Sequence, residues 1–364
     1  MRLSGTLSFY IARQVLLWIA LVAGVLLAVV FLFDTVELLR RAASRSDVGV
    51  GLVFAMALLK APTMLQEIIS FAVLFGAMAA FARLSRHHEL VIVRASGVSA
   101  WQFMLPAMAV AVALGAAKLG FVNPLAASMQ ARFEAVESRL LESGASALTL
   151  TGNGLWLRQA EAGGEAILHT PVPPGADMRL VNVTLFRYDA TGRFIGRVDA
   201  RSGALEDGQW RLVDAVVATP NEPARQVATY VLATELTSDR IMDSFSSPET
   251  ISFWDLPGFI DTMQKAGLPA LRHRLEWNRL ASSPFMLAAM VLLAGAFSMR
   301  PSRQGGVLLL IGAGIAAGFV IYFGSDIVFA LGLSQAVPVP LAAWAPALFT
   351  ALLGGSLLIH MEDG

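Results

Sequence analysis

The sequence predicts an α-helical membrane protein with six transmembrane helices, three on each side of an inserted all-β domain. Hydrophobic residues make up 56% of the 364 residues and charged residues only 15%, which departs from soluble composition. Six apolar stretches are long enough to cross a bilayer core about 30 Å thick as helices. Between the third and fourth stretches the pattern changes to the alternation typical of strands. We therefore expect three segments: 1–122, 123–276 and 277–364.

The first expected span, 15–33, has no charged residue. It is followed directly by Asp34 and lacks a small-residue cleavage site, so it predicts a retained anchor rather than a signal peptide. The second span, about 52–84, contains Lys60 and Glu67, and the third, about 101–122, contains Lys118. The last three spans are expected at about 278–299, 307–331 and 341–360.

Basic residues in short loops predict the orientation, because they are retained on the cytoplasmic side. With a cytoplasmic N-terminus, the short outer loops hold three arginines, Arg40, Arg41 and Arg45. The inner segments then hold seven, namely Arg2, Arg13, Arg83, Arg86, Arg94, Arg300 and Arg303. The count favours both termini in the cytoplasm and the β domain on the outer side.

The inserted segment is polar and rich in strand signals. Residues 122–280 hold 15 Lys or Arg and 19 Asp or Glu. Stretches such as 181–188 and 209–217 are rich in β-branched and aromatic residues, and turn-forming residues separate them. Short strands at this spacing indicate a sandwich or an open barrel, with helical connectors at about 123–144 and 252–275.

The chain lacks the sequence motifs of several enzyme classes. It has no cysteine, which excludes thiolate nucleophiles and zinc-thiolate or iron–sulfur sites. Its three lysines, Lys60, Lys118 and Lys265, are each followed by Ala or Leu, so no phosphate loop is present. His87 and His88 are adjacent and would point about 100° apart on a helix, which does not favour a metal site. Net charge is zero and no basic patch favours nucleic acid. We expect neither an enzyme nor a metal or cofactor bound by this chain.

The expected cytoplasmic loop, about 85–99, predicts a short amphipathic helix that ends near Gly97. Such a helix could lie on anionic lipid or dock on a soluble protein. Glu89 beside the apolar stripe favours the protein, because a carboxylate suits an arginine in a protein groove and not a lipid headgroup.

The stretch 71–97, which ends in Glu-Leu-Val-Ile-Val-Arg-Ala-Ser-Gly, resembles the lipopolysaccharide export permeases LptF and LptG. The resemblance extends over the six spans and the β insert, and Asp34-Thr-Val-Glu-Leu-Leu-Arg-Arg41 is more like the G type. It implies that the loop is the coupling helix for a cytoplasmic ATPase, with Glu89, Leu90, Arg94, Ser96 and Gly97 at the contact. ATP and Mg²⁺ would then be used by that partner.

The resemblance implies further partners and a place in the cell. The chain would be a permease subunit of an ABC transporter in the bacterial inner membrane. It would work with an LptF-type sister permease, an LptB-type ATPase dimer and LptC- and LptA-type periplasmic jelly-roll proteins. The β insert would be a periplasmic jelly roll, and the cargo would be lipopolysaccharide on its way to the outer membrane.

Four cations are candidates for the lipid headgroup: Arg40, Arg41, Lys60 and Arg132. They are expected at one level near the outer ends of the spans, where they could bind phosphates. Asp34 adds a negative charge at that level. Snorkelling to the bilayer headgroups is the alternative for Lys60. For Lys118 the alternatives are likewise a functional role or snorkelling to the headgroups, because an ionisable group inside a membrane span is energetically costly.

Two further sets of candidates follow from the resemblance. Gly314, Gly318 and Asp326 in the fifth span are candidates for a subunit interface, and Gly-x-x-x-Gly allows close helix packing. Trp156, Phe186, Phe194 and Trp210 are candidates for the lining of an apolar groove in the β domain. A place in the ordinary core is the alternative for each aromatic residue.

Two other functions stay open from the sequence. The chain could be a scaffold that anchors a periplasmic assembly without transport. It could also be an ion-coupled carrier that uses Asp326 and Lys60 as a relay.

Overall fold

The computed structural model describes residues 5–43, 49–87, 89, 99–140, 147–151, 154–161, 164–171, 179–206, 208–220, 222–234, 247–265, 269–298 and 307–363. The chain forms two compact units. The helical unit contains Met1–Phe133, Ser252–Trp254 and Leu271–Gly364, and the β unit contains Glu134–Ile251 and Asp255–Ala270.

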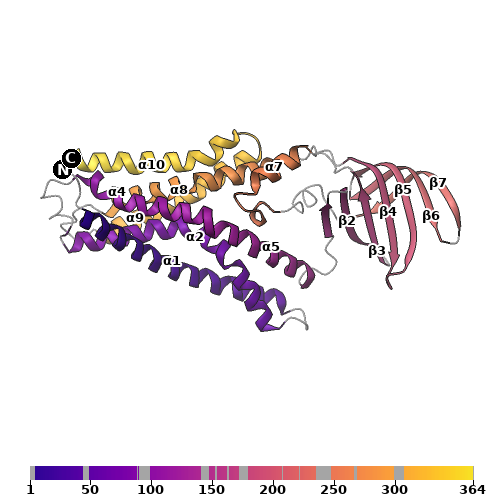
Figure 1. Ribbon diagram of the computed structural model, residues 1–364, viewed down its shortest axis with the longest axis horizontal. Coiled ribbons are helices and arrows are strands. Elements are labelled where there is room, and N and C mark those ends of the chain that lie inside the picture. Colours follow the sequence, from indigo (N-terminus) through magenta and orange to yellow (C-terminus); the bar gives the residue numbers. More distant parts are fainter. Residues whose placement is uncertain are drawn as a thin grey trace. The chain divides into compact units, whose positions relative to one another are not determined.

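Within the described residues, six helical segments are long and apolar enough to cross a membrane, so the expected fold class is confirmed. The first three segments are α1 (Gly5–Ala42), α2 (Val50–Arg86) and a run made of α4 (Ala100–Ala117), the π-helix η1 (Lys118–Val122) and α5 (Asn123–Leu140). The last three are α8 (Leu271–Ser298), α9 (Val307–Leu333) and α10 (Val339–Asp363). In Figure 1, α1 begins and α10 ends at the same end of the helical unit.

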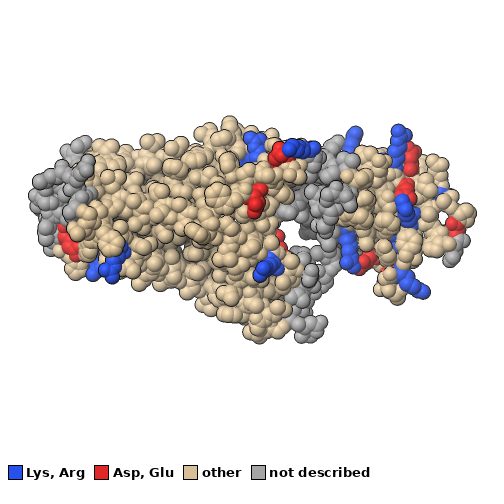
Figure 2. All heavy atoms as spheres, in the orientation of Figure 1, with Lys and Arg blue, Asp and Glu red and all other residues tan. Residues whose placement is uncertain are grey.

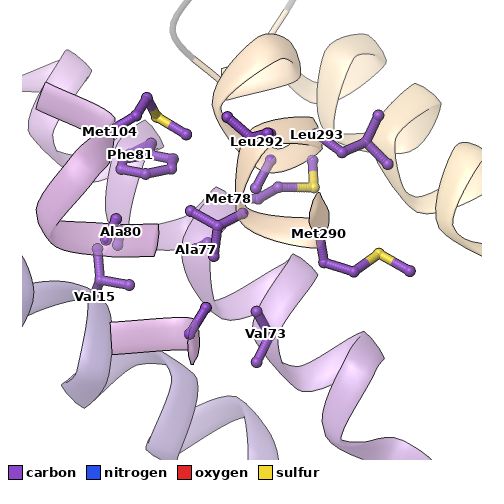
Figure 3. Packing of buried hydrophobic residues seen from close by; sticks show 14 of the residues in the cluster. Val15, Val73, Ala77, Met78, Ala80, Phe81, Met104, Met290, Leu292 and Leu293 are labelled. Atoms are coloured by element: carbon purple, nitrogen blue, oxygen red, sulfur yellow. The ribbon is translucent and has the colours of Figure 1, made fainter. Parts of the chain in front are cut away.

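The helical unit is built around α8, the most buried of the six spans, while α1 is the least buried. Apolar side chains from α1, α2, α4 and α8 converge in one core, which includes Val15, Phe81, Met104 and Leu293 (Figure 3). Burial of such side chains in membranes depends on close packing, because lipid is as apolar as the core.

Glycines bring pairs of these helices together. A Cβ added at Gly76 of α2 would lie 2.5 Å from the Cα atom of Ile19 in α1. One added at Gly354 of α10 would lie 2.8 Å from the backbone nitrogen of Leu293 in α8. Neither helix pair could approach this closely with a larger residue at these positions.

The surface of the helical unit matches a membrane environment. On the face shown in Figure 2, charged side chains are sparse over the middle of the helices and gather toward their ends. Large apolar side chains on α1 and α9 remain exposed, among them Leu21, Phe33, Val320 and Ile327. In water such a surface would aggregate, so it indicates contact with lipid or with other membrane helices.

The described strands of the β unit form one antiparallel sheet of seven strands in chain order. Its strands are β1 (Ala147–Thr151), β2 (Gly154–Glu161), β3 (Gly164–Thr170), β4 (Arg179–Asp189), β5 (Phe194–Glu206), β6 (Gln209–Thr219) and β7 (Glu222–Ala233). The 3-10 turn η2 (Pro248–Thr250) and α7 (Leu256–Lys265) follow β7.

One face of the sheet carries the core of the β unit. It is lined by alternating apolar residues, including Leu157, Leu168, Leu185 and Leu212, and α7 packs on it through Met263. The Gln159 side chain of β2 donates a hydrogen bond to the Ala233 carbonyl of β7 at 3.0 Å. The sheet therefore curls so that two strands far apart in its order meet across the buried face.

Candidate functional site

The expected coupling segment lies largely outside the described residues. Leu90, Arg94, Ser96 and Gly97 are not described, so the structure leaves their role a prediction. Glu89 is described and is half-buried. The Tyr10 hydroxyl of α1 donates a hydrogen bond to Glu89 Oε2 at 3.0 Å. Sequence reasoning missed Tyr10, because a tyrosine near the start of a span looks like an ordinary interfacial residue.

At the other end of the α1–α2 hairpin, where α1 ends and α2 begins, five of the described residues form a charged group. We call Asp34, Glu37, Arg40, Arg41 and Lys60 the hairpin-end cluster. Asp34 of α1 and Lys60 of α2 form an ion pair. Their side chains are only 21% and 27% exposed, so this pair is partly withdrawn from solvent.

The two arginines of the cluster share one carboxylate. Arg40 makes two hydrogen bonds to Glu37, both at 2.8 Å, through its Nε and Nη2 atoms. Arg41 Nε donates to Glu37 Oε1 at 2.9 Å. Each of the three candidate headgroup cations on α1 and α2 therefore already contacts a carboxylate of this chain.

Arg132, the fourth candidate cation, lies on α5 next to Phe133. It is exposed, and among the described residues no carboxylate pairs with it. Phe133 is buried, and the Lys60 ammonium lies 5.2 Å from the centre of its ring. Arg132 directly precedes Phe133, so the fourth cation lies one residue along α5 from a contact of the hairpin-end cluster.

A polar chain links three segments inside the helical unit. The Asn123 side chain donates to Gln66 Oε1 at 3.3 Å and accepts from the Phe253 backbone N–H at 2.7 Å. Lys118 Nζ donates to the Gln66 carbonyl at 3.4 Å. The π-helix η1 begins at Lys118 and ends just before Asn123, and π-bulges of this kind are frequent at functional sites. Polar residues in these spans thus bond to one another, as their cost in lipid requires.

The candidate interface residues of α9 divide into two kinds. Gly314 and Gly318 are buried, and an added Cβ would overlap Met78 and Leu74 of α2 in the same chain. Close packing within the chain accounts for both glycines. Asp326 is exposed, as is the neighbouring Ile327. A role at a subunit interface stays a prediction, and the exposed face of α9 is the part available for it.

The four candidate lining residues of the β unit do not share one face. Trp210 is 1% exposed and lies in the core on the concave side with Leu232. Trp156 and Phe186 lie in the alternate positions of their strands. The centre of the Trp156 ring lies 4.1 Å from that of the His169 ring, with the planes tilted by 35°, and Phe186 contacts the Arg197 guanidinium. Phe194 starts β5 and is 44% exposed.

Comparison with known proteins identifies the family. Residues 9–360 match the family model described as "Lipopolysaccharide export system permease LptF/LptG". The chain belongs to this permease family. It is similar to the lipopolysaccharide export system permease protein LptG of Escherichia coli strain K12, with 24% identity over 372 residues that cover 98% of each chain. The LptG protein of E. coli O6:H1 strain CFT073 matches to the same extent. The resemblance seen in the sequence is thereby confirmed, and the chain is a multi-pass membrane permease.

Proposed function

We propose that this permease is the LptG-type subunit of an ABC transporter that extracts lipopolysaccharide from the inner membrane and passes it toward the periplasm. The observation that carries the proposal is the match over residues 9–360, which spans both helical halves and the β insert. The sequence contains no phosphate loop, so ATP and Mg²⁺ would be used by a separate, LptB-type ATPase dimer.

In this proposal the ATPase docks at the segment around Glu89. A glutamate carboxylate forms short, charge-assisted hydrogen bonds with arginine, which gives a docking contact both strength and direction. The hydrogen bond from Tyr10 joins Glu89 to α1, so movement of the segment reaches α1 as well as α2. The termini would lie on the same, cytoplasmic side as this segment.

The lipid would be held between this subunit and an LptF-type sister by apolar walls such as the exposed faces of α1 and α9. Arg132 is the best placed cation for a phosphate, because among the described residues no carboxylate already pairs with it. The β unit would lie in the periplasm and hand the lipid to LptC- and LptA-type jelly-roll proteins. Its edge strand β7 has mostly exposed residues, which suits pairing with another strand.

Charge reversal at Glu89 tests the proposal. Wild-type protein purified in mild detergent is expected to bring with it an ATPase and a second six-span subunit. Glu89→Arg should lose the ATPase, because like charges would then face each other in the groove. Glu222→Arg, the same reversal at an exposed position of β7, is the matched control and should keep the ATPase. If Glu89→Arg retains the ATPase and lipid transport, the coupling assignment is wrong.

Two further experiments separate the two other functions. A scaffold would tolerate replacement of residues 85–99 by a neutral linker. An ion-coupled carrier would transport with a proton gradient and without ATP. The relay that such a carrier needs has no support in the contacts of Lys60, which pairs with Asp34 and not with Asp326.

A further inference from the structure

The hairpin-end cluster holds three cations and two carboxylates, and every cation in it contacts a carboxylate. We propose that Asp34 is a specificity-determining residue: by neutralising Lys60 it makes this part of the permease favour amphiphiles whose headgroup carries little negative charge at this position. The inference rests on the proposed function, since it concerns which lipid the permease takes.

Lys60 is not readily available to an anionic ligand. Its partner Asp34 has a second carboxylate oxygen, Oδ2, that is buried and without a hydrogen-bond partner among the described residues. A phosphate that drew Lys60 away would leave this partly buried carboxylate without its one ion-pair partner among the described residues. Removing one member of a withdrawn ion pair costs far more than the pair itself contributes. The Asp34–Lys60 pair should therefore persist when a lipid binds.

The arginines of the cluster behave differently. Arg40 and Arg41 have side chains 76% and 56% exposed, and Glu37 is 39% exposed. Exposed pairs of this kind contribute little to stability, so a ligand can displace Glu37 at small cost. Even then the Glu37 charge stays within a few ångströms and weakens the attraction between the arginines and a phosphate.

The net effect is a weakly positive site. With Arg132 included, two carboxylates offset two of the four positive charges. A bare set of four cations would favour a headgroup with two phosphates. The compensated set instead suits a saccharide headgroup that presents hydroxyl groups, with at most one anionic group near the arginines and Arg132.

Two probe lipids that differ only in phosphate test this inference. The full-length protein, with the subunits that co-purify, is placed in lipid nanodiscs. Its Kd is then measured for a lipid A that carries two phosphates and for the same lipid after both phosphates are removed. Asp34→Asn frees Lys60 while keeping the size of the side chain. It should shift the Kd ratio toward the phosphorylated lipid by about tenfold, the effect of one charge-assisted hydrogen bond.

Two further variants show whether the charge of Lys60 is the cause. In Asp34→Asn combined with Lys60→Gln, the freed cation is gone and the ratio should return to the wild-type value. Asp261→Asn, which breaks the Asp261–Lys265 pair on α7, is the matched control and should leave the ratio unchanged. If Asp34→Asn does not fold, Glu37→Gln at an exposed position should shift the ratio in the same direction.

The outcomes are distinct. A ratio within twofold of wild type in a folded Asp34→Asn or Glu37→Gln protein would overturn the inference and leave the proposed function standing. A shift that persists in the double variant would also overturn it, since the effect would then not depend on Lys60. If the wild-type protein binds neither lipid, the proposed function itself fails and the inference fails with it.

Discussion

Gly76 should be the position at which the α1–α2 pair is most sensitive to added volume. A Cβ at this position would lie 2.5 Å from Ile19 Cα, 2.8 Å from Ile19 N and 2.9 Å from Ile19 Cγ1. Carbon atoms in good contact are about 3.5–4.0 Å apart, so α1 would have to retreat by about 1 Å. The obstacle is mostly backbone, which cannot rotate away as a side-chain tip could.

Gly76→Ala combines two opposing effects. Overpacking of this kind costs about 1–3 kcal/mol, and the higher helix propensity of alanine returns up to about 1 kcal/mol. We expect a net loss of about 1–2 kcal/mol, seen as a fall of about 2–6 °C in the Tm of the detergent-purified protein. Gly24→Ala in α1 is the matched control, because its added Cβ would meet nothing within 4 Å. That variant should keep or raise the Tm, and equal Tm values for the two variants would refute the close approach of α1 and α2.

Three other predictions follow from contacts in the two units. Tyr10→Phe should weaken coupling of ATP hydrolysis to lipid, measured on the purified complex, and should have no further effect in a Glu89→Gln background because the hydroxyl acts through that carboxylate. The Thr191 hydroxyl and the backbone N–H groups of the turn lower the pKa of Asp189 to about 2. Its contribution to the stability of the turn should be complete at neutral pH and be lost as pH falls from about 4 toward about 2. The Tm difference between wild type and Asp189→Asn should therefore shrink steadily as thermal melts are taken from pH 6 down to about pH 2, and a constant difference would contradict this. Trp210→Ala should destabilise the β unit by about 3–5 kcal/mol, because it empties a fully buried site, whereas Trp210→Phe should cost less; chemical denaturation followed by fluorescence of the remaining tryptophans checks both, and equal losses would contradict the packing.

Hydropathy was sufficient to predict the architecture. Each expected span coincides with a helix, although most helices extend beyond the apolar stretch; α1 runs over Gly5–Ala42 where 15–33 was expected. The polar turns at these ends continue a helix because the backbone hydrogen bonds of the apolar part favour its propagation. The expected strand stretches 181–188 and 209–217 lie within β4 and β6, since alternation and turn residues are local signals.

The faces of the strands were harder to predict. Alternation shows which residues of one strand share a face, but not which face the sheet buries. Trp156 and Trp210 both looked like lining residues, yet only Trp210 lies in the core. The direction of curling decides this, and it depends on contacts such as Gln159 with Ala233 that join residues 74 positions apart.

Local sequence patterns likewise do not predict which residues of two helices pair with each other. Asp34 and Lys60 are 26 residues apart, and the sequence placed them at one level without showing that they face each other. Their rotation about the helix axes is fixed by apolar packing elsewhere on α1 and α2, above all the contact of Ile19 with Gly76. A cation in a span therefore has to be weighed with every carboxylate at its depth before a ligand is assigned to it.

The contacts of α1 give the coupling proposal a physical route. α1 is the least buried span, yet it is joined to α2 and its continuation at three levels: Tyr10 with Glu89, Ile19 with Gly76, and Asp34 with Lys60. Two helices tied at both ends and closely packed between them resist sliding and bending, so they respond to force as one body. A displacement at Glu89 would then reach the hairpin-end cluster without passing through the core around α8. Loss of the Tyr10 hydroxyl removes one of these three contacts and leaves the other two. We therefore expect weaker coupling of ATP hydrolysis to lipid transport without unfolding of the protein.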